Sequence, residues 1–379
     1  MAGLSVDDQQ YQLPTWARSF LVAGLIYVFL VGVSSLESGI KVMGADTQDR
    51  LFSSVENPLA GLFIGLLGTV LVQSSSASTA VIVGLVGAGT LGVDDAVPMV
   101  MGANIGTTVT NTLVALAHIR QSAEFKRAFA AATVHDFFNV IAVLVLLPVE
   151  LTTGLLSGTA EWLSDQLVGS AGTEWESPIK EAVKGPVGLL QNGWEAFGAR
   201  ENVLGTLLVL TGFVIVLSAL TLITKNMRTL VADRVERSLN AVLGKGGGLV
   251  AMLLGLVITV SVQSSSITTS ILIPLSAAGV LSLRNVYPVT LGANVGTTIT
   301  AILAALASNR PEALTVALVH TLFNISGILL LYPIPMLREI PPRAAEALAT
   351  VAAERRTLAV AYVFGVFVVV PLVGLAILR

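Results

Sequence analysis

QSSS, at residues 73–76, recurs in the second half of the chain at residues 263–266. Each copy interrupts an apolar stretch near its middle, the first at about 58–91 and the second at about 248–281. Each stretch is long for one membrane-spanning helix, which needs about 20 residues, and its polar break lies where such a helix should be most apolar. Both stretches therefore predict a re-entrant helical hairpin, whose broken backbone is buried in protein rather than facing lipid.

Two further motifs recur in the same order. GANIGTT at residues 102–108 returns as GANVGTT at residues 292–298, at the same offset as the two QSSS copies. His135 and Asn139 return as His320 and Asn324, at a slightly shorter offset. Three ordered motifs at a nearly constant offset indicate an internal duplication, and the glycine-containing motif predicts a broken helix in each half.

The composition is that of a membrane protein. Hydrophobic residues make up 54% of the 379 residues, charged residues only 12%, and the mean hydropathy is +0.82. A soluble chain of this length needs far more charge to cover its surface. The net charge of -3, with no basic and aromatic cluster, gives no reason to expect a nucleic-acid partner. The absence of cysteine excludes disulfides, zinc–thiolate sites and a thiol nucleophile.

The remaining apolar runs predict an all-α polytopic protein. The polar N-terminus has no basic region before the first run, so we expect no cleaved signal peptide. Residues 1–149 are predicted as the first transmembrane repeat, 150–202 as a connector, 203–333 as the second repeat, and 334–379 as a loop with a C-terminal spanning helix. The expected spanning helices are at about 19–36, 96–117, 128–149, 203–224, 286–307, 313–333 and 356–378.

Lysine and arginine placement predicts the orientation. If both hairpins return to the side they entered from, the basic loops all fall on one face, which we interpret as cytoplasmic. The connector at 150–202, rich in acidic residues, falls on the opposite, extracytoplasmic face. The two repeats are then inverted, the arrangement in which secondary transporters place substrate near the middle of the membrane. The basic residues of the cytoplasmic face include Arg18, Arg120, Lys126, Arg127, Lys225, Arg228, Arg234, Arg237, Lys245, Arg338, Arg343, Arg355 and Arg356.

The QSSS and GANxGTT motifs contain oxygen ligands and predict helix ends, but they contain no charged residue. Hydroxyl, amide and main-chain oxygens suit a hard cation such as sodium. A helix that resumes after a serine run offers unpaired N–H groups to an anion. With no arginine or lysine in the motifs, a divalent anion needs a counter-charge, and co-bound sodium would supply it. The predicted phosphate ligands are Ser74, Ser75, Ser76, Asn104, Ser264, Ser265, Ser266 and Asn294.

At these motifs the sequence resembles the type II sodium-dependent phosphate cotransporter family. The matching segments are the two QSSS motifs, 102–111, 127–130 and 133–139, and the resemblance runs from about residue 20 to 333. It implies a secondary active symporter that imports inorganic phosphate, chiefly divalent, with sodium, at a site between the two QSSS hairpins. It implies sodium ligation centred on the second QSSS, with first-half residues opposite. The sodium ligands so implied are Gln73, Ser75, Thr107, Thr110, Gln263, Ser264, Thr297 and Thr300.

The sequence departs from the family in two ways. Electrogenic members carry an aspartate where this chain has Gln121, so we expect two rather than three sodium ions per divalent phosphate. The connector lacks the family's cysteine pair and glycosylation sequons, as in a compact prokaryotic member. Seven spans also leave the C-terminus outside, whereas the family is usually drawn with both ends inside. The expected location is the plasma (inner) membrane, with lipid, sodium and phosphate as partners and no organic cofactor.

Several alternatives stay open. A sodium-coupled carrier of sulfate or a dicarboxylate would use similar hairpins. A membrane enzyme is disfavoured because the serine runs have no neighbouring base in sequence and the chain has no HExxH motif. A receptor or scaffold would not need a second, inverted copy of the site. His135 and His320 fit helix–helix hydrogen bonding better than ligand binding, and Asp136 is interpreted as structural.

Overall fold

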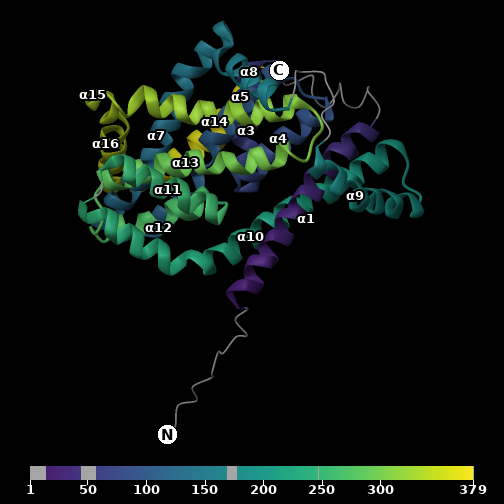
Figure 1. The fold of residues 1–379 in the computed structure, drawn as a ribbon. Helices are drawn as coiled ribbons and strands as arrows, with labels where there is room; N and C mark the ends of the chain where they lie inside the picture. The colour runs from purple at the N-terminus through teal and green to yellow at the C-terminus, as the bar shows by residue number, and fades with distance from the viewer. Residues whose placement is uncertain (1–13, 44–56, 169–176, 246, 379) are drawn as a thin grey trace.

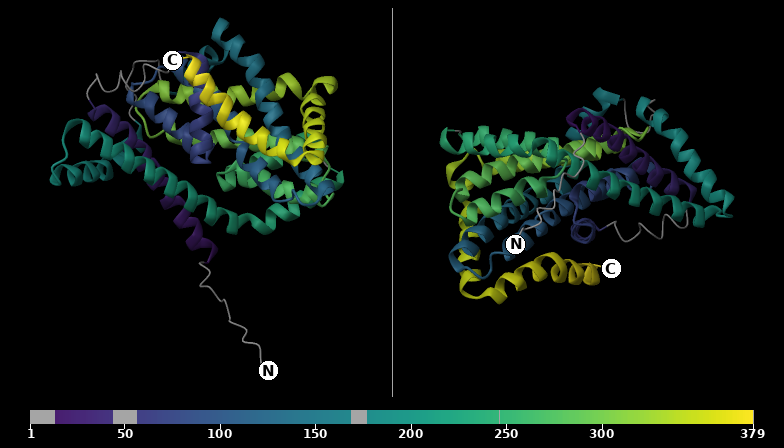
Figure 2. Two further views of the ribbon diagram at one scale, coloured as in Figure 1. Left: turned by 180° about the vertical axis from the view of Figure 1, so that it is seen from behind. Right: turned by 90° about the horizontal axis from the view of Figure 1, so that it is seen from below.

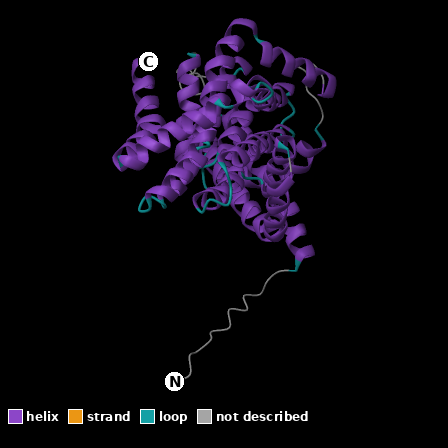
Figure 3. Cartoon of the chain, turned by 90° about the vertical axis from the view of Figure 1, so that its left-hand side faces the viewer, coloured by secondary structure: helices purple, strands orange, loops and turns teal. Residues whose placement is uncertain are grey.

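The computed structural model describes residues 14–43, 57–168, 177–245 and 247–378, and all their regular secondary structure is helical (Figure 3). Six of the described helical segments are long and apolar enough to cross a membrane, which confirms an all-α, multi-pass architecture. They are α1 (Thr15–Val42), α7 (Ser122–Thr153), the Glu201–Arg228 part of α10 (Glu201–Lys245), α13 (Leu283–Ala305), α14 (Pro311–Leu331) and the C-terminal run Arg356–Leu378.

Both QSSS motifs lie at the junction of two short helices. α3 (Pro58–Val72) is followed by α4 (Ser75–Ala88), and α11 (Gly248–Val262) by α12 (Ser265–Ala277). At each junction a glutamine, Gln73 or Gln263, takes the left-handed conformation with φ 57° and ends the first helix. The following serine caps the second helix. At 13 to 15 residues these helices are shorter than the roughly 20 residues that a bilayer crossing needs.

Glycines let the first helix of each pair approach a neighbouring helix at backbone distance. A Cβ at Gly102, in α5 (Val93–Gly106), would lie 1.9 Å from the carbonyl oxygen of Leu62 in α3. A Cβ at Gly292, in α13, would lie 1.8 Å from the carbonyl oxygen of Met252 in α11. Both partners of the second contact follow those of the first at the offset of the QSSS motifs, so the duplication seen in the sequence extends to the helix packing.

The predicted helix break is present in one half only. The first-half span expected at 96–117 is α5 followed by α6 (Val109–Leu116), separated by Thr107 and Thr108. In the second half α13 runs unbroken from Leu283 to Ala305, so the prediction of a break there was wrong. Both halves bond their threonine hydroxyls back to the preceding turn, so these bonds alone do not interrupt a helix.

α1 and α10 form an antiparallel pair at the side of the helical block (Figure 1). A Cβ at Gly39 of α1 would lie 2.7 Å from the carbonyl oxygen of Gly205, and one at Gly212 of α10 would lie 2.7 Å from that of Gly32. Beside this pair lies α9 (Pro178–Ala196), whose Lys180 forms an ion pair of 2.9 Å with the buried Glu37 of α1. From this pair α10 continues towards the second QSSS region.

Further helices occupy segments predicted only as connector and loop. The connector contains α8 (Leu155–Val168) and α9, and α15 (Pro335–Arg338) and α16 (Ile340–Glu354) precede the last span. That span consists of α17 (Arg356–Phe364), a π-helical turn (Gly365–Val369) and α18 (Val370–Leu378). It runs along the outside of the molecule (Figure 2), and only 17% of its most apolar window is buried, as suits a helix facing lipid.

Candidate functional site

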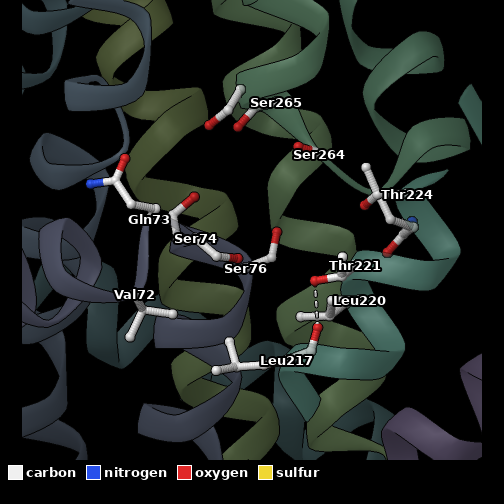
Figure 4. Close-up of a pocket in the computed structure, with 13 residues that line it drawn as sticks. Val72, Gln73, Ser74, Ser76, Leu217, Leu220, Thr221, Thr224, Ser264 and Ser265 are labelled. Carbon is white, nitrogen blue, oxygen red and sulfur yellow. Dashed lines mark hydrogen bonds between the residues drawn. The ribbon is translucent and has the colours of Figure 1, made fainter. Parts of the chain in front are cut away.

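The two QSSS motifs meet at one cavity. It has a volume of about 230 Å³, and one wall of it belongs to α10. Figure 4 shows Ser74 and Ser76 facing Ser264 and Ser265 across the cavity, with Thr221 and Thr224 on a third side. The lining residues are Val72, Gln73, Ser74, Ser75, Ser76, Leu217, Leu220, Thr221, Thr224, Gln263, Ser264, Ser265 and Ser266.

Two helix N-termini open into this cavity. α4 begins at Ser75 and α12 at Ser265, each after a serine cap whose side chain accepts one backbone N–H. The other N–H groups of a first helical turn have no partner within their own helix, and the helix dipole makes this end partly positive. Such an end binds anions. The cavity therefore presents two convergent sets of N–H donors.

The serine hydroxyls at these helix starts are uncommitted. Among the described residues, the side chains of Ser75, Ser76, Ser265 and Ser266 make no hydrogen bond. Their carbonyl oxygens, in contrast, accept hydrogen bonds from Thr79 and Thr269, one turn later. The backbone at each helix start is thus held in place while the hydroxyls remain available to a ligand.

The two glutamines bring together the predicted sodium ligands. The amide nitrogen of Gln263 donates to the carbonyl of Val260, and its oxygen accepts from Thr300 at 2.9 Å. Gln73 repeats this pattern with Val70 and with Thr110, at 3.2 Å from the threonine hydroxyl. In each half an amide oxygen and a hydroxyl thus lie side by side, which is suitable chemistry for a hard cation.

The predicted phosphate ligands Asn104 and Asn294 do not line the cavity. Each is 1% exposed, and both donate side-chain hydrogen bonds to the amide oxygen of Asn324, at 3.1 and 2.9 Å. Asn139 joins the same network by donating to the carbonyl of Asn104 and accepting from Asn294, and His320 Nε2 lies 3.3 Å from Asn104 Oδ1. This network ties α5, α7, α13 and α14 together across the two halves.

Thr107 and Thr297, predicted as sodium ligands, also lie outside the cavity lining. Each is buried, and each hydroxyl donates to the carbonyl one turn earlier, Ala103 or Ala293. The structure thus brings together both glutamines and all six serines of the predicted set. It places Thr110 and Thr300 behind the glutamines as their hydrogen-bond partners.

The wall formed by α10 was missed by sequence reasoning. Leu217, Leu220, Thr221 and Thr224 lie on one helical face, three to four residues apart, inside the span predicted at 203–224. Two hydroxyls on one face of an apolar helix were the available signal. A second missed contact joins the halves, since Thr269 of α12 donates to Asn111 of α6 at 2.9 Å.

No charged side chain lines the cavity, as its thirteen lining residues are Ser, Thr, Gln, Leu and Val. The described residues also contain no group of three or more His, Cys, Asp or Glu that could hold a metal ion. The polarity of the site comes from helix ends, amides and hydroxyls. These groups can coordinate an alkali cation or an oxyanion without offering either a full opposite charge.

Comparison with known proteins places these features in a family. The Na+/Pi-cotransporter family profile matches residues 28–153 and 215–338, and each segment contains one QSSS motif. The chain is 35% identical to the sheep sodium-dependent phosphate transport protein 2A over 93% of its length, and 36% identical to the rat protein, also over 93%. It is 34% identical to the human sodium-dependent phosphate transport protein 2B over 94% of its length.

The chain spans 66% of the length of the sheep and rat proteins and 64% of the human protein. No solved structure matches it. The resemblance seen in the motifs is confirmed over most of the sequence, and it is to transporters rather than to enzymes. The chain belongs to the Na+/Pi-cotransporter family.

Proposed function

We propose that this protein is a secondary active symporter that imports inorganic phosphate, in its divalent form, with sodium. The relatives are named sodium-dependent phosphate transport proteins. The observation that carries the proposal is the convergence of two helix N-termini and six serines on one uncharged cavity. We assign phosphate to the serines of 74–76 and 264–266, and Asn104 and Asn294 to holding the helices behind them.

The uncharged lining gives sodium a role in binding. A divalent anion transferred from water into a cavity without cationic side chains is strongly disfavoured unless counter-ions accompany it. Two sodium ions would neutralise divalent phosphate and leave no net charge to move across the membrane. Binding of one ion then favours binding of the other, and this reciprocity couples their transport.

We assign the main sodium site to Gln263, Ser264, Thr297 and Thr300, with Gln73, Ser75, Thr107 and Thr110 as the first-half counterpart. The hydrogen bond from Thr300 to the Gln263 oxygen supports this assignment, because it holds a hydroxyl oxygen and an amide oxygen side by side, where one sodium ion would contact both. Thr297 lies one turn before Thr300 on the same helix, and its hydroxyl would have to leave its bond to the Ala293 carbonyl to bind the ion.

The same proposal includes an arrangement in the membrane. The two repeats, 1–149 and 203–333, would be inverted relative to each other and would alternate access to the cavity by moving against one another. The QSSS hairpins would enter and leave on the same side, with basic loops in the cytoplasm and the 150–202 connector outside. The expected membrane is the plasma, or inner, membrane.

A carrier of another oxyanion is the second candidate, because neither hydroxyls nor helix N-termini distinguish phosphate from sulfate or a carboxylate. Uptake of radiolabelled phosphate into proteoliposomes, with sodium or potassium outside and the membrane potential clamped at zero, tests both. We expect sodium-dependent phosphate uptake that unlabelled sulfate and succinate do not compete away. Equal phosphate uptake with sodium and with potassium outside would refute the coupling. Sodium-dependent uptake that unlabelled sulfate or succinate competes away would support the second candidate.

A further inference from the structure

A second cavity, of about 500 Å³, lies at the end of the helical block where α16 packs on α7. Its lining includes three cationic side chains, Lys126, Arg127 and Arg343, and one carboxylate, Glu346. These come from α7 and α16. Another wall is formed by Ser276 at the end of α12 and by Leu281, Ser282 and Leu283 at the start of α13. In contrast to the QSSS cavity, this one carries an excess of positive charge.

Two of the three cations have no partner of their own. Among the described residues, Lys126 and Arg343 form no ion pair and no side-chain hydrogen bond, and both are exposed. Glu346 likewise forms no ion pair within the described part of the chain. The positive charge at this cavity is therefore available to an external anion.

Arg127 is held in a fixed orientation. Its Nε donates to the carbonyl oxygen of Ala277 at 2.8 Å and to that of Ser276 at 3.2 Å, at the C-terminal end of α12. Its Nη2 also donates to Ala277. These contacts leave donors of the guanidinium free, and a pre-oriented arginine is well suited to an oxyanion. The same helix, α12, begins at the QSSS cavity.

Two further features favour a phosphate group at a membrane surface. α13 begins beside the cavity after Ser282, whose side chain makes no capping bond. The N–H groups of Asn285 and Val286 bond the Ser282 carbonyl, which leaves those of Leu283 and Arg284 open to an anion. Next to lining residues lie Val280 and Val351, which are 59% and 49% exposed. Apolar side chains beside cationic ones match the boundary between acyl chains and headgroups.

We propose that this cavity binds a phosphomonoester group, carried by an anionic lipid of the leaflet that it faces. Arg127 and Arg343 would hold the phosphate oxygens, Lys126 would supply further charge, and the volume leaves room for the glycerol backbone. The site is separate from the QSSS cavity, and its lining shares no residue with it. Free inorganic phosphate presents the same chemistry and is the other source that the experiment must distinguish.

The test measures binding to the purified full-length chain in sodium-free potassium buffer. Dioctanoyl phosphatidic acid and inorganic phosphate are the two probes, and dioctanoyl phosphatidylcholine is the zwitterionic comparison. We expect phosphatidic acid to bind, and the Lys126→Gln/Arg343→Gln variant to bind it roughly tenfold more weakly. Arg228→Gln, which removes an exposed arginine from α10, is the matched control and should bind as the unmodified chain does.

The Glu346→Gln variant is expected to bind more tightly, a result that a loss of folded protein could not produce. Removing the one carboxylate that opposes an anion should tighten phosphatidic acid binding by about threefold. Binding of inorganic phosphate alone, with the same response to the variants, would assign the site to the free ion. Binding of neither probe, or binding that all these substitutions leave unchanged, would overturn the proposal.

Discussion

The two QSSS regions have the same backbone conformation but differ in how deeply their side chains are buried. In both, a left-handed glutamine and a capping serine start a helix at the cavity, and the glutamine amide bonds the carbonyl three residues earlier. Gln73 is nevertheless exposed and its partner Thr110 half-buried, whereas Gln263 is half-buried and Thr300 is 1% exposed. The proposed phosphate ligands are thus arranged in the same way in both halves, whereas the proposed sodium ligands of the second half are more deeply buried than those of the first.

The helices behind the two glutamines differ in the same sense. Thr110 lies in the short helix α6, after the break at Thr107 and Thr108, whereas Thr300 lies in the continuous α13. A ligand on an unbroken, buried helix is held more rigidly, and a desolvated site makes ion–dipole contacts stronger. This difference predicts that sodium depends chiefly on the second half and phosphate on both.

The largest loss of stability is expected at Gly102 and Gly292, where the two halves pack a helix against its neighbour in the same way. Gly102→Ala and Gly292→Ala would each place a Cβ under 2 Å from a backbone carbonyl oxygen, which cannot move without shifting a helix. Each should destabilise the protein by about 3 kcal/mol, visible as a large loss in the unfolding temperature in detergent. Gly68→Ala is the control, because nothing lies within 4 Å of its added methyl group. A stable Gly292→Ala beside an unstable Gly102→Ala would contradict the equivalence of the two packings.

Many of the helices and helix breaks compared above could be predicted from the sequence. The duplicated motifs predict the helix break at each QSSS motif, and the long apolar runs predict the helices that are long and apolar enough to span, because spanning helices need about 20 apolar residues. Hydropathy did not predict α9 or α16, which are amphipathic and fall below the threshold for a span. The break after Gly106 and the continuity after Gly296 are equally hidden, since both follow the same glycine and threonine pattern.

The polar residues show where sequence reasoning stops. Asn104 and Asn294 fit a ligand pattern, yet each amide bonds Asn324 between packed helices, which also satisfies a buried polar group. Thr221 and Thr224 have no counterpart motif, yet they line the cavity because α10 happens to cross it. Which of two polar residues faces a cavity depends on how helices pack, and a periodic pattern leaves that choice open.

The next largest effect should separate the two glutamines. Gln263→Leu removes the oxygen that Thr300 approaches at 2.9 Å in a buried setting, and we expect the sodium concentration for half-maximal phosphate uptake to rise about tenfold. Gln73→Leu removes its exposed counterpart and should raise it about threefold or less. Uptake measured over a range of sodium concentrations gives both values. If the two substitutions raised this sodium concentration equally, burial would not decide which of the two proposed sodium sites matters more.

The smallest effect, on phosphate affinity, is expected at the cavity wall formed by α10, which has no counterpart in the first half. α10 lines the cavity through Thr221 and Thr224, whereas no residue of α1, the partner of α10, is among the lining residues. Thr224→Val keeps the shape and removes a hydroxyl, so we expect phosphate to bind about two- to threefold more weakly with sodium affinity unchanged. Ser34→Ala, which removes a buried hydroxyl from α1, is the control and should leave phosphate affinity unchanged. If both substitutions weakened phosphate equally, the effect would come from helix packing, and the cradle would be formed by the two QSSS motifs alone.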